Sequence, residues 1–232
     1  MNWLLLCGFL WAGAQEDLDI AANPNVSEEL RMAAFNRLVQ IGATDLNVIR
    51  DTALSGEEEL RKRWVSIRIL GKVGGAPARE ILPPLSVDPD PAIRAASLSA
   101  LGDLGSSDFV DIIQVRLKDE AIIVRAAAAE ALGKIKDPQA IPSLSKALQA
   151  SDARYRGASL WVRRHYVDAL RDIGSSDAYP ALLRSLYDDD PSVVQATIVA
   201  LEVIAGFDFK EGRDLEAQKE AWRRWLQSQL SE

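Results

Sequence analysis

The chain has 232 residues, of which 48% are hydrophobic and 26% are charged, so it can form a packed core. Its formal net charge is −7. This charge disfavours general attraction to nucleic acid or to an anionic membrane surface, because both depend on an excess of Lys and Arg. We therefore expect no nucleic-acid partner.

The first fourteen residues carry no charged side chain and end in Ala12-Gly13-Ala14, directly before the polar Gln15-Glu16-Asp17. A short apolar stretch that ends in small residues resembles a secretory signal peptide. It is too short to cross a bilayer as a helix, which requires about 20 apolar residues. We therefore expect a signal peptide at 1–14, and an exported, periplasmic or extracellular mature chain without a transmembrane span. The alternative is an apolar segment that caps the fold of a cytoplasmic protein.

Cysteine is almost absent from the sequence. Cys7 is the single cysteine, and it lies within the expected signal peptide. A chain cleaved after Ala14 would have no disulfide and no thiolate metal site. The next segment, residues 15–26, is polar and acidic, and we expect it to be a linker.

From residue 27 onward, six segments of the chain align on one column of leucines. The column consists of Leu38, Leu70, Leu101, Leu132, Leu170 and Leu201. Successive leucines are 31 or 32 residues apart, except for one step of 38. With the exception of Lys62, apolar or small residues recur eight and four positions before each leucine and three after it, which places them on one face of an α-helix. A fixed period in the thirties predicts stacked helical repeats.

Shorter helices are expected between these segments, at 45–54, 75–85, 108–118, 138–148 and 177–187. Aspartate precedes proline at Asp90-Pro91, Asp137-Pro138 and Asp190-Pro191. Each pair combines an N-cap side chain with a proline at the first helical position. The sequence thus predicts an all-α fold, a right-handed α-solenoid of about six helical hairpins over residues 27–206.

The C-terminal residues 207–232 predict a closing helix. An apolar stripe is formed there by Leu215, Trp222, Trp225, Leu226 and Leu230. The open end of a stack of repeats needs a cap with one polar face. We expect the two tryptophans to anchor this cap rather than to hold a ligand.

Two stretches, 88–120 and 122–149, resemble HEAT repeats of the phycobilisome-lyase-like type. The resemblance lies in an Asp-Pro turn, an aliphatic residue followed by Arg, an alanine-rich second helix, a Leu-Gly exit and an Ala-Ile-Pro first helix. It extends over about residues 27–205, and the C-terminal segment is similar to the closing helix of exported bacterial HEAT-repeat proteins. The sequence departs from the pattern at Val39, Lys62, Lys136 and Val194.

One arginine recurs one residue after the start of the buried stripe in five of the repeats. These arginines are Arg31, Arg63, Arg94, Arg125 and Arg163. The resemblance implies a structural ladder in which they bind turn aspartates such as Asp88 and Asp119 through charge-assisted hydrogen bonds. The alternative is a row of substrate-binding residues, but recurrence in each repeat favours the structural role.

The sequence provides no set of catalytic or metal-binding residues. His165 is the only histidine, whereas metal sites and acid–base catalysis usually combine several groups. Deoxyhypusine hydroxylase, which resembles this chain in fold, binds iron through His-Glu pairs, and this sequence has no such pair. The run Asp188-Asp189-Asp190 fits a turn before a helix better than a calcium loop. We expect no catalytic residue, metal or cofactor.

The best candidate binding region is the irregular repeat. The 38-residue step adds about seven residues, and insertions in solenoids often lie on the binding face. The insertion is basic and aromatic, as interface hot spots often are. Its candidate protein-binding residues are Arg154, Tyr155, Arg156, Trp161, Arg164 and His165. Alternatively, Trp161 and Tyr166 fill space where other repeats have small side chains. A second, weaker patch is Arg61-Lys62-Arg63 with Trp64.

Two functions remain open at this point. The first is a non-catalytic, exported scaffold or adaptor that binds another protein. The second is a bilin lyase or isomerase, or a helper subunit of one, which rests on the resemblance of the repeats alone. Binding to the DNA backbone, a third possibility, is disfavoured by the net charge.

Overall fold

The computed structural model describes residues 3–42, 46–150, 154–155, 158–159, 161–212 and 214–231. Side chains are described for residues 13–42, 46–150, 161–212 and 214–231. The chain forms two compact units, an N-terminal unit (Met1–Leu104) and a C-terminal unit (Gly105–Glu232), and each is described by itself.

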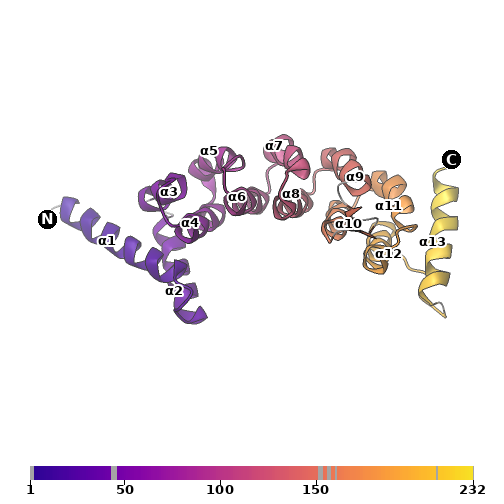
Figure 1. Ribbon diagram of the computed structural model, residues 1–232, viewed down its shortest axis with the longest axis horizontal. Helices are drawn as coiled ribbons and strands as arrows, with labels where there is room; N and C mark the ends of the chain where they lie inside the picture. The colour runs from indigo at the N-terminus through magenta and orange to yellow at the C-terminus, as the bar shows by residue number, and fades with distance from the viewer. Residues whose placement is uncertain are drawn as a thin grey trace. The chain divides into compact units, whose positions relative to one another are not determined.

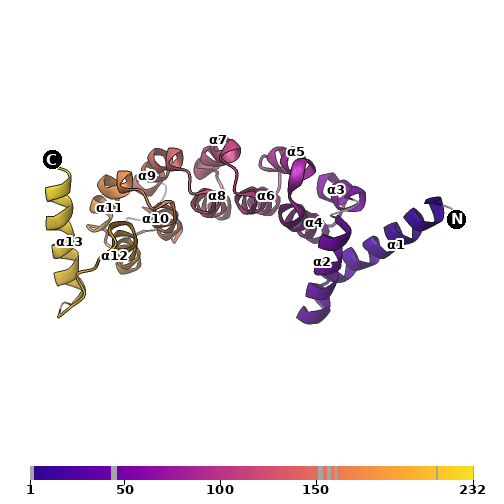
Figure 2. The same ribbon diagram turned by 180° about the vertical axis from the view of Figure 1, so that it is seen from behind.

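The N-terminal unit consists of helical hairpins. Its helices are α1 (Trp3–Ala22), α2 (Glu28–Gly42), α3 (Asn47–Leu54), α4 (Leu60–Val73), α5 (Gly75–Leu85) and α6 (Pro91–Leu104). In Figures 1 and 2, α3 and α5 form one layer, and α4 and α6 form the other. The second helices of the hairpins pack in order, α2 against α4 and α4 against α6.

The C-terminal unit repeats this arrangement. Its α-helices are α7 (Val110–Val115), α8 (Ile122–Ile135), α9 (Ile141–Gln149), α10 (Val162–Ile173), α11 (Tyr179–Ser185), α12 (Pro191–Ala205) and α13 (Leu215–Gln229). The first helices of its hairpins are shorter than expected, because 3-10 turns replace their ends at η1 (Ser107–Phe109), η2 (Arg116–Lys118), η3 (Pro138–Ala140) and η5 (Ser176–Ala178). Here α10 packs against both α8 and α12.

The leucine column forms the core of the stack. All six leucines have no exposed surface. Full burial of a leucine side chain stabilises the fold by about 1.5–3 kcal/mol, so the column is a major source of stability. The predicted all-α architecture of stacked helical hairpins is confirmed. The insertion adds one unexpected feature, a pair of two-residue antiparallel strands, β1 (Arg154–Tyr155) and β2 (Ala158–Ser159), in which Arg154 lies opposite Ser159.

The second helices approach one another closely at the glycine that follows a column leucine. A Cβ atom added to Gly71 of α4 would lie 2.8 Å from the Cβ of Ala100 on α6. In the other unit, a Cβ on Gly133 of α8 would lie 3.1 Å from the Cα of Ala169 on α10. A side chain at Gly71 would force the two helices to shift, and one at Gly133 would make an unusually tight contact, so glycine favours this spacing.

Helix α1 differs from what the sequence suggests for its second half. Residues 15–22, expected to be part of a polar linker, continue the helix to Ala22. Leu18 is fully buried, and Ala14 and Ala22 are nearly so. The polar side chains on the exposed side of α1 conceal this narrow apolar stripe in the sequence. Within the described residues, no helix is long and apolar enough to cross a membrane.

Ion pairs hold α1 to α2 and to α4. The Arg37 Nε of α2 donates to both carboxylate oxygens of Asp17, at 3.0 and 3.1 Å. The Lys62 Nζ of α4 lies 2.5 Å from Asp19, and this hydrogen bond raises the pKa of Lys62. Lys62 stands in a column that is aliphatic in the other repeats. Its departure from the repeat pattern is therefore explained by the pairing with α1.

The C-terminal helix α13 covers α11 and α12 through an aromatic cluster. Trp222 and Leu226 are fully buried. The Trp222 ring stacks on Phe207, with centroids 5.2 Å apart, and meets Phe209 edge-on at 4.8 Å. Trp225 packs edge-on against Trp222 at 5.4 Å. Such aromatic pairs add to the free energy gained from burial, so the tryptophans serve as anchors of the helix.

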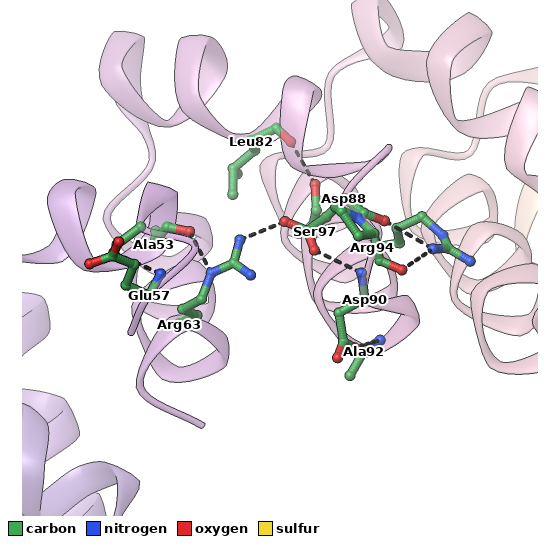
Figure 3. Close-up of polar contacts among 11 residues, drawn as sticks. Ala53, Glu57, Arg63, Leu82, Asp88, Asp90, Ala92, Arg94 and Ser97 are labelled. Atoms are coloured by element: carbon green, nitrogen blue, oxygen red, sulfur yellow. Dashed lines mark hydrogen bonds and ion pairs between the residues drawn. The ribbon is translucent and has the colours of Figure 1, made fainter. Parts of the chain in front are cut away.

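Arg63 links three elements of the N-terminal unit, as Figure 3 shows. Its Nε donates to the carbonyl oxygen of Ala53 at the end of α3, at 3.3 Å. Its Nη2 donates to Asp88 at 2.5 Å. The other oxygen of Asp88 accepts from the backbone N–H of Asp90, at 2.9 Å. Both charged side chains are about nine-tenths buried, so each depends on the other.

The same arrangement recurs in the C-terminal unit. The Arg163 Nε donates to the carbonyl oxygen of Leu148 at the end of α9, at 3.1 Å. Its guanidinium pairs with Asp188, which accepts from the backbone N–H of Asp190 at 3.0 Å. The arginine and the aspartate are 25 residues apart in both units. One repeat-to-repeat contact is thus built twice.

The remaining arginines of this set make different contacts. Arg94 is buried and donates to the carbonyl oxygens of Asp88 and Pro89, at 2.9 and 3.1 Å (Figure 3). Arg125 is buried and donates to the carbonyl oxygen of Asp119 at 3.3 Å. Arg31 is only half-buried, and among the described residues its Nε has no hydrogen-bond partner. Arg31 therefore differs in environment from the other four.

Replacing Arg163 tests the structural role of these contacts. Arg163→Ala leaves Asp188 buried without its partner, and we expect a loss of about 3–5 kcal/mol in the free energy of unfolding. The neighbouring Arg164→Ala is the control, because the Arg164–Asp168 pair at 3.6 Å is exposed and contributes about 1 kcal/mol or less. Urea denaturation followed by circular dichroism measures both. Equal losses would contradict the structural role.

Candidate functional site

The insertion, the candidate region of the sequence, is only partly within the described residues. Arg156 lies outside them, and for Arg154 and Tyr155 only the backbone of β1 is described. The described candidate side chains are those of Trp161, Arg164 and His165, at the start of α10. The geometry of this region is therefore described by these three side chains.

Trp161 and His165 form a small polar and aromatic group on α10. Their rings meet edge-on, with centroids 5.1 Å apart. The His165 Nδ1 lies 3.0 Å from a carboxylate oxygen of Glu130 on α8. Trp161 remains 51% exposed, and Arg164 is exposed beside Asp168. The group therefore presents one exposed aromatic ring whose neighbours are already paired within the chain.

Tyr166 has the role of a space-filling side chain, because it is almost fully buried. It lies at the base of a cavity of about 680 Å³ between α7 and α9. The walls are polar in part, with Ser143 donating to Gln114 at 2.7 Å. Gln114 also donates to Asp111 at 2.8 Å, so three of the polar side chains that line this cavity are bonded to one another.

A second concavity, the α2–α4 groove, lies in the N-terminal unit. It has a volume of about 590 Å³, in the range of ligand and anchor pockets. The residues that line it are Ala21, Glu28, Arg31, Met32, Phe35, Asn36, Val39, Trp64, Val65, Arg68 and Lys72. They come from α2 and α4, with one residue from the end of α1. No sequence pattern singled out this groove as a whole.

The α2 wall of the groove carries an apolar strip beside the polar side chains of Glu28, Arg31 and Asn36. Met32, Phe35 and Val39 follow one another at spacings of three and four residues, so they share one face of the helix. Met32 is 53% exposed, and Phe35 and Val39 are half-buried. An exposed apolar strip of this kind is typical of an interaction surface.

The α4 wall combines an aromatic ring with cations. Trp64 is 40% exposed, and the Arg68 guanidinium lies 5.4 Å from its ring centroid. Such a cation–π contact is favourable but leaves the guanidinium N–H groups free to donate. The Arg68 Nε is buried and has no hydrogen-bond partner in the described part of the chain. Lys72 at the far end pairs with Asp103 at 3.2 Å.

The basic run noted in the sequence separates into different roles on α4. Arg63 is buried in the contact with Asp88, and Lys62 pairs with Asp19. Arg61 is exposed, and no ion pair to it is found among the described residues. It precedes Trp64 and Arg68 on the same face of the helix, because the spacings are three and four residues. Arg61 thus extends the α4 wall beyond Trp64.

The origin of the groove lies in two departures from the repeat. Val39 stands where Gly71 and Gly133 allow close approach of the second helices. On α4, the residue before the column leucine is Ile69, whereas on α6 the residue at the same position is Ala100, which lies against Gly71. Because two branched side chains replace a glycine and an alanine, we infer that α2 and α4 cannot approach as closely as α4 and α6 do. The signal for the groove was therefore present in the sequence, at Val39.

No metal-binding group is formed by the described residues, since nowhere among them do three or more His, Cys, Asp or Glu side chains converge. The groove has a single acidic lining residue, Glu28, together with three cations and an apolar strip. This arrangement suits an apolar ligand surface that carries negative charge. It provides no pair of groups for acid–base chemistry.

Comparison with known families agrees with this architecture. A family profile described as HEAT repeats matches residues 78–161. Among solved structures, the chain is similar to one chain of the complex of CpcE and CpcF of phycocyanin lyase from Nostoc sp. PCC7120. The two sequences are 25% identical, the TM-score is 0.60, and the match covers 70% of this chain and 65% of that chain.

The matched profile and the similarity to the lyase chain together support a HEAT-repeat protein of the phycobilisome-lyase-like type. This chain spans 65% of the lyase chain that it matches. Two engineered proteins share the fold: one is 20% identical, with a TM-score of 0.56 over 84% of this chain and 90% of that chain. The other is 19% identical, with a TM-score of 0.53, and the match covers 83% of this chain and 53% of that chain. No curated protein matches the sequence.

Replacing Arg68 of this HEAT-repeat protein tests whether it serves stability. Arg68→Met keeps an apolar stem in place of the arginine stem but removes the buried Nε donor. Leaving such a donor without an acceptor costs about 1–3 kcal/mol in the wild-type protein. We therefore expect the free energy of unfolding to stay the same or to rise. Arg63→Met is the matched control and should lose several kcal/mol. Both are measured by urea denaturation, and a comparable loss in Arg68→Met would show that this residue is structural.

Proposed function

We propose that this HEAT-repeat protein is a non-catalytic scaffold or adaptor that binds another protein, and that the α2–α4 groove is its docking surface. The observation that carries the proposal is the composition of this groove. It combines exposed Met32 and Trp64 with Arg68, whose buried Nε has no acceptor among the described residues.

Three properties of the groove support this function. Trp, Arg and Met are enriched at protein interfaces, and the first two dominate hot spots. A partner would bury the exposed parts of Met32 and Trp64, which releases water from apolar surface. It would also pair with the Arg68 guanidinium, which has no ion pair among the described residues. Each effect favours the bound state.

We also propose that the protein is exported and that its mature chain begins at Gln15. Among the described side chains of α1, Asp17, Leu18 and Asp19 contact the stack and lie after this point. Cleavage after Ala14 would therefore leave these contacts in place. The mature chain would keep the cap of its first repeat.

Export predicts a defined mature N-terminus. Intact-mass spectrometry of the protein purified from its native host should give the mass of a chain that begins at Gln15. Protein that retains residues 1–14, in a cytoplasmic fraction that is free of membranes, would contradict export. It would leave the docking surface unaffected.

A second candidate function is a lyase or isomerase for bilins, or a helper subunit of one. It is favoured by the likeness to a chain of the CpcE and CpcF complex of phycocyanin lyase, which is 25% identical to this chain. Co-expression with a phycobiliprotein and a bilin discriminates the two candidates. A coloured covalent adduct that depends on this protein would favour the second.

Photo-crosslinking tests the docking surface directly. We expect benzoylphenylalanine at Met32 to give discrete protein adducts when the native host is irradiated. Gln195 is the matched control, because it is exposed and also lies six residues before its column leucine, Leu201. Adducts should be absent there. No adduct at Met32, or the same adducts at both positions, would contradict the proposal.

A further inference from the structure

We propose that the α2–α4 groove binds an amphipathic helix whose apolar stripe is bordered, on the side that meets α4, by acidic side chains. This inference rests on the proposed function, because it specifies the chemistry of the partner. It follows from the length of the groove, from the order of side chains along its two walls, and from the distribution of charge.

The length of the groove fits a helix of two to three turns. The apolar strip extends over eight residues, from Met32 to Val39, or about 10 Å for seven steps of 1.5 Å. The α4 wall extends from Trp64 to Lys72, over about 12 Å. A groove between two helices offers a row of holes to the side chains of a third helix. Anchors at positions i, i+3 or i+4, and i+7 of a bound helix match this length.

The walls differ in character, which fixes the orientation of the ligand's faces. Met32, Phe35 and Val39 give α2 an uninterrupted apolar strip. On α4, Trp64 is followed at four-residue intervals by Arg68 and Lys72, so apolar surface gives way to positive charge. An inserted helix would therefore place apolar side chains against α2 and acidic side chains against α4.

The charge along the α4 wall is only partly matched by acidic residues of the described chain. Arg61 and Arg68 have no ion pair there, and the only carboxylate lining the groove is Glu28, at the start of α2. Lys72 shares its charge with Asp103, but it is half exposed. In a protein with a net charge of −7, this wall is a local exception. Charge complementarity therefore favours an acidic partner over a basic one.

Peptide binding tests this inference with a defined probe. The probe is a fluorescein-labelled, end-capped helical peptide of about 15 residues, enough for four turns. Its leucines lie at i, i+3 and i+7, and the border facing α4 carries Glu, Gln or Lys in three otherwise identical versions. Fluorescence anisotropy with the full chain should rank affinities Glu, then Gln, then Lys. Each matched charge should change the Kd by roughly two- to fivefold, since exposed pairs contribute little.

Substitutions in the groove locate the binding. Trp64→Ala should weaken the Glu peptide at least about tenfold, as expected for a central aromatic anchor. Trp161→Ala is the control, because it removes an exposed tryptophan that lies outside the groove, at the insertion. Arg68→Glu should reverse the preference, so that the Lys peptide binds more tightly than the Glu peptide. Arg224→Glu, at an exposed arginine of α13, should leave the ranking unchanged.

Several results would overturn the inference. These are the absence of binding by any peptide, equal affinities for the three versions, a preference for Lys, or a loss with Trp161→Ala but not with Trp64→Ala. Stronger binding to phosphatidylglycerol vesicles than to the Glu peptide would assign the cations to a membrane surface instead. Failure of the peptides alongside protein adducts at Met32 would overturn this inference and leave the proposed function standing.

Discussion

The structure depends on close contact between the second helices of successive hairpins. The column leucines bury their side chains between these helices. The helices meet where Gly71 lies against Ala100 and, in the other unit, where Gly133 lies against Ala169. A Cβ at Gly71 would overlap Ala100, and a Cβ at Gly133 would make an unusually tight contact with Ala169, so the spacing depends on the lack of a side chain. Where the sequence replaces this pair by larger residues, at Val39, the protein has a groove.

Arginine serves two purposes within two turns of one helix. Arg63 points into the stack and binds both Ala53 and Asp88, which joins consecutive repeats. Arg61 and Arg68 lie on the other face of α4 without an ion pair in the described chain. The buried pair limits how the repeats can slide, because separating its charges is costly. Arg61 and Arg68 do not join repeats in this way, which is why we assign them to recognition.

Much of the architecture could be predicted from residues that recur. The leucine column and the arginines at 63 and 163 stand out in the sequence because the same packing contacts recur from one repeat to the next. The end of α1 could not be predicted in this way, since Asp17 and Asp19 have no equivalents in other repeats and resemble solvated linker residues. The groove was missed for a related reason: it depends on a position, Val39, where the repeat is broken. For the insertion, described side chains begin only at Trp161.

The most direct test of this account is the free energy of unfolding of Gly71→Ala. Inside a helix, replacing glycine by alanine normally stabilises a protein by about 1 kcal/mol. Here the added Cβ would lie 2.8 Å from that of Ala100, and overpacking of this kind costs about 1–3 kcal/mol. We therefore predict a net loss of stability, whereas Gly56→Ala, which has open space around it, should be neutral or stabilising. A gain in stability for Gly71→Ala would contradict the close contact on which the stack and its groove depend.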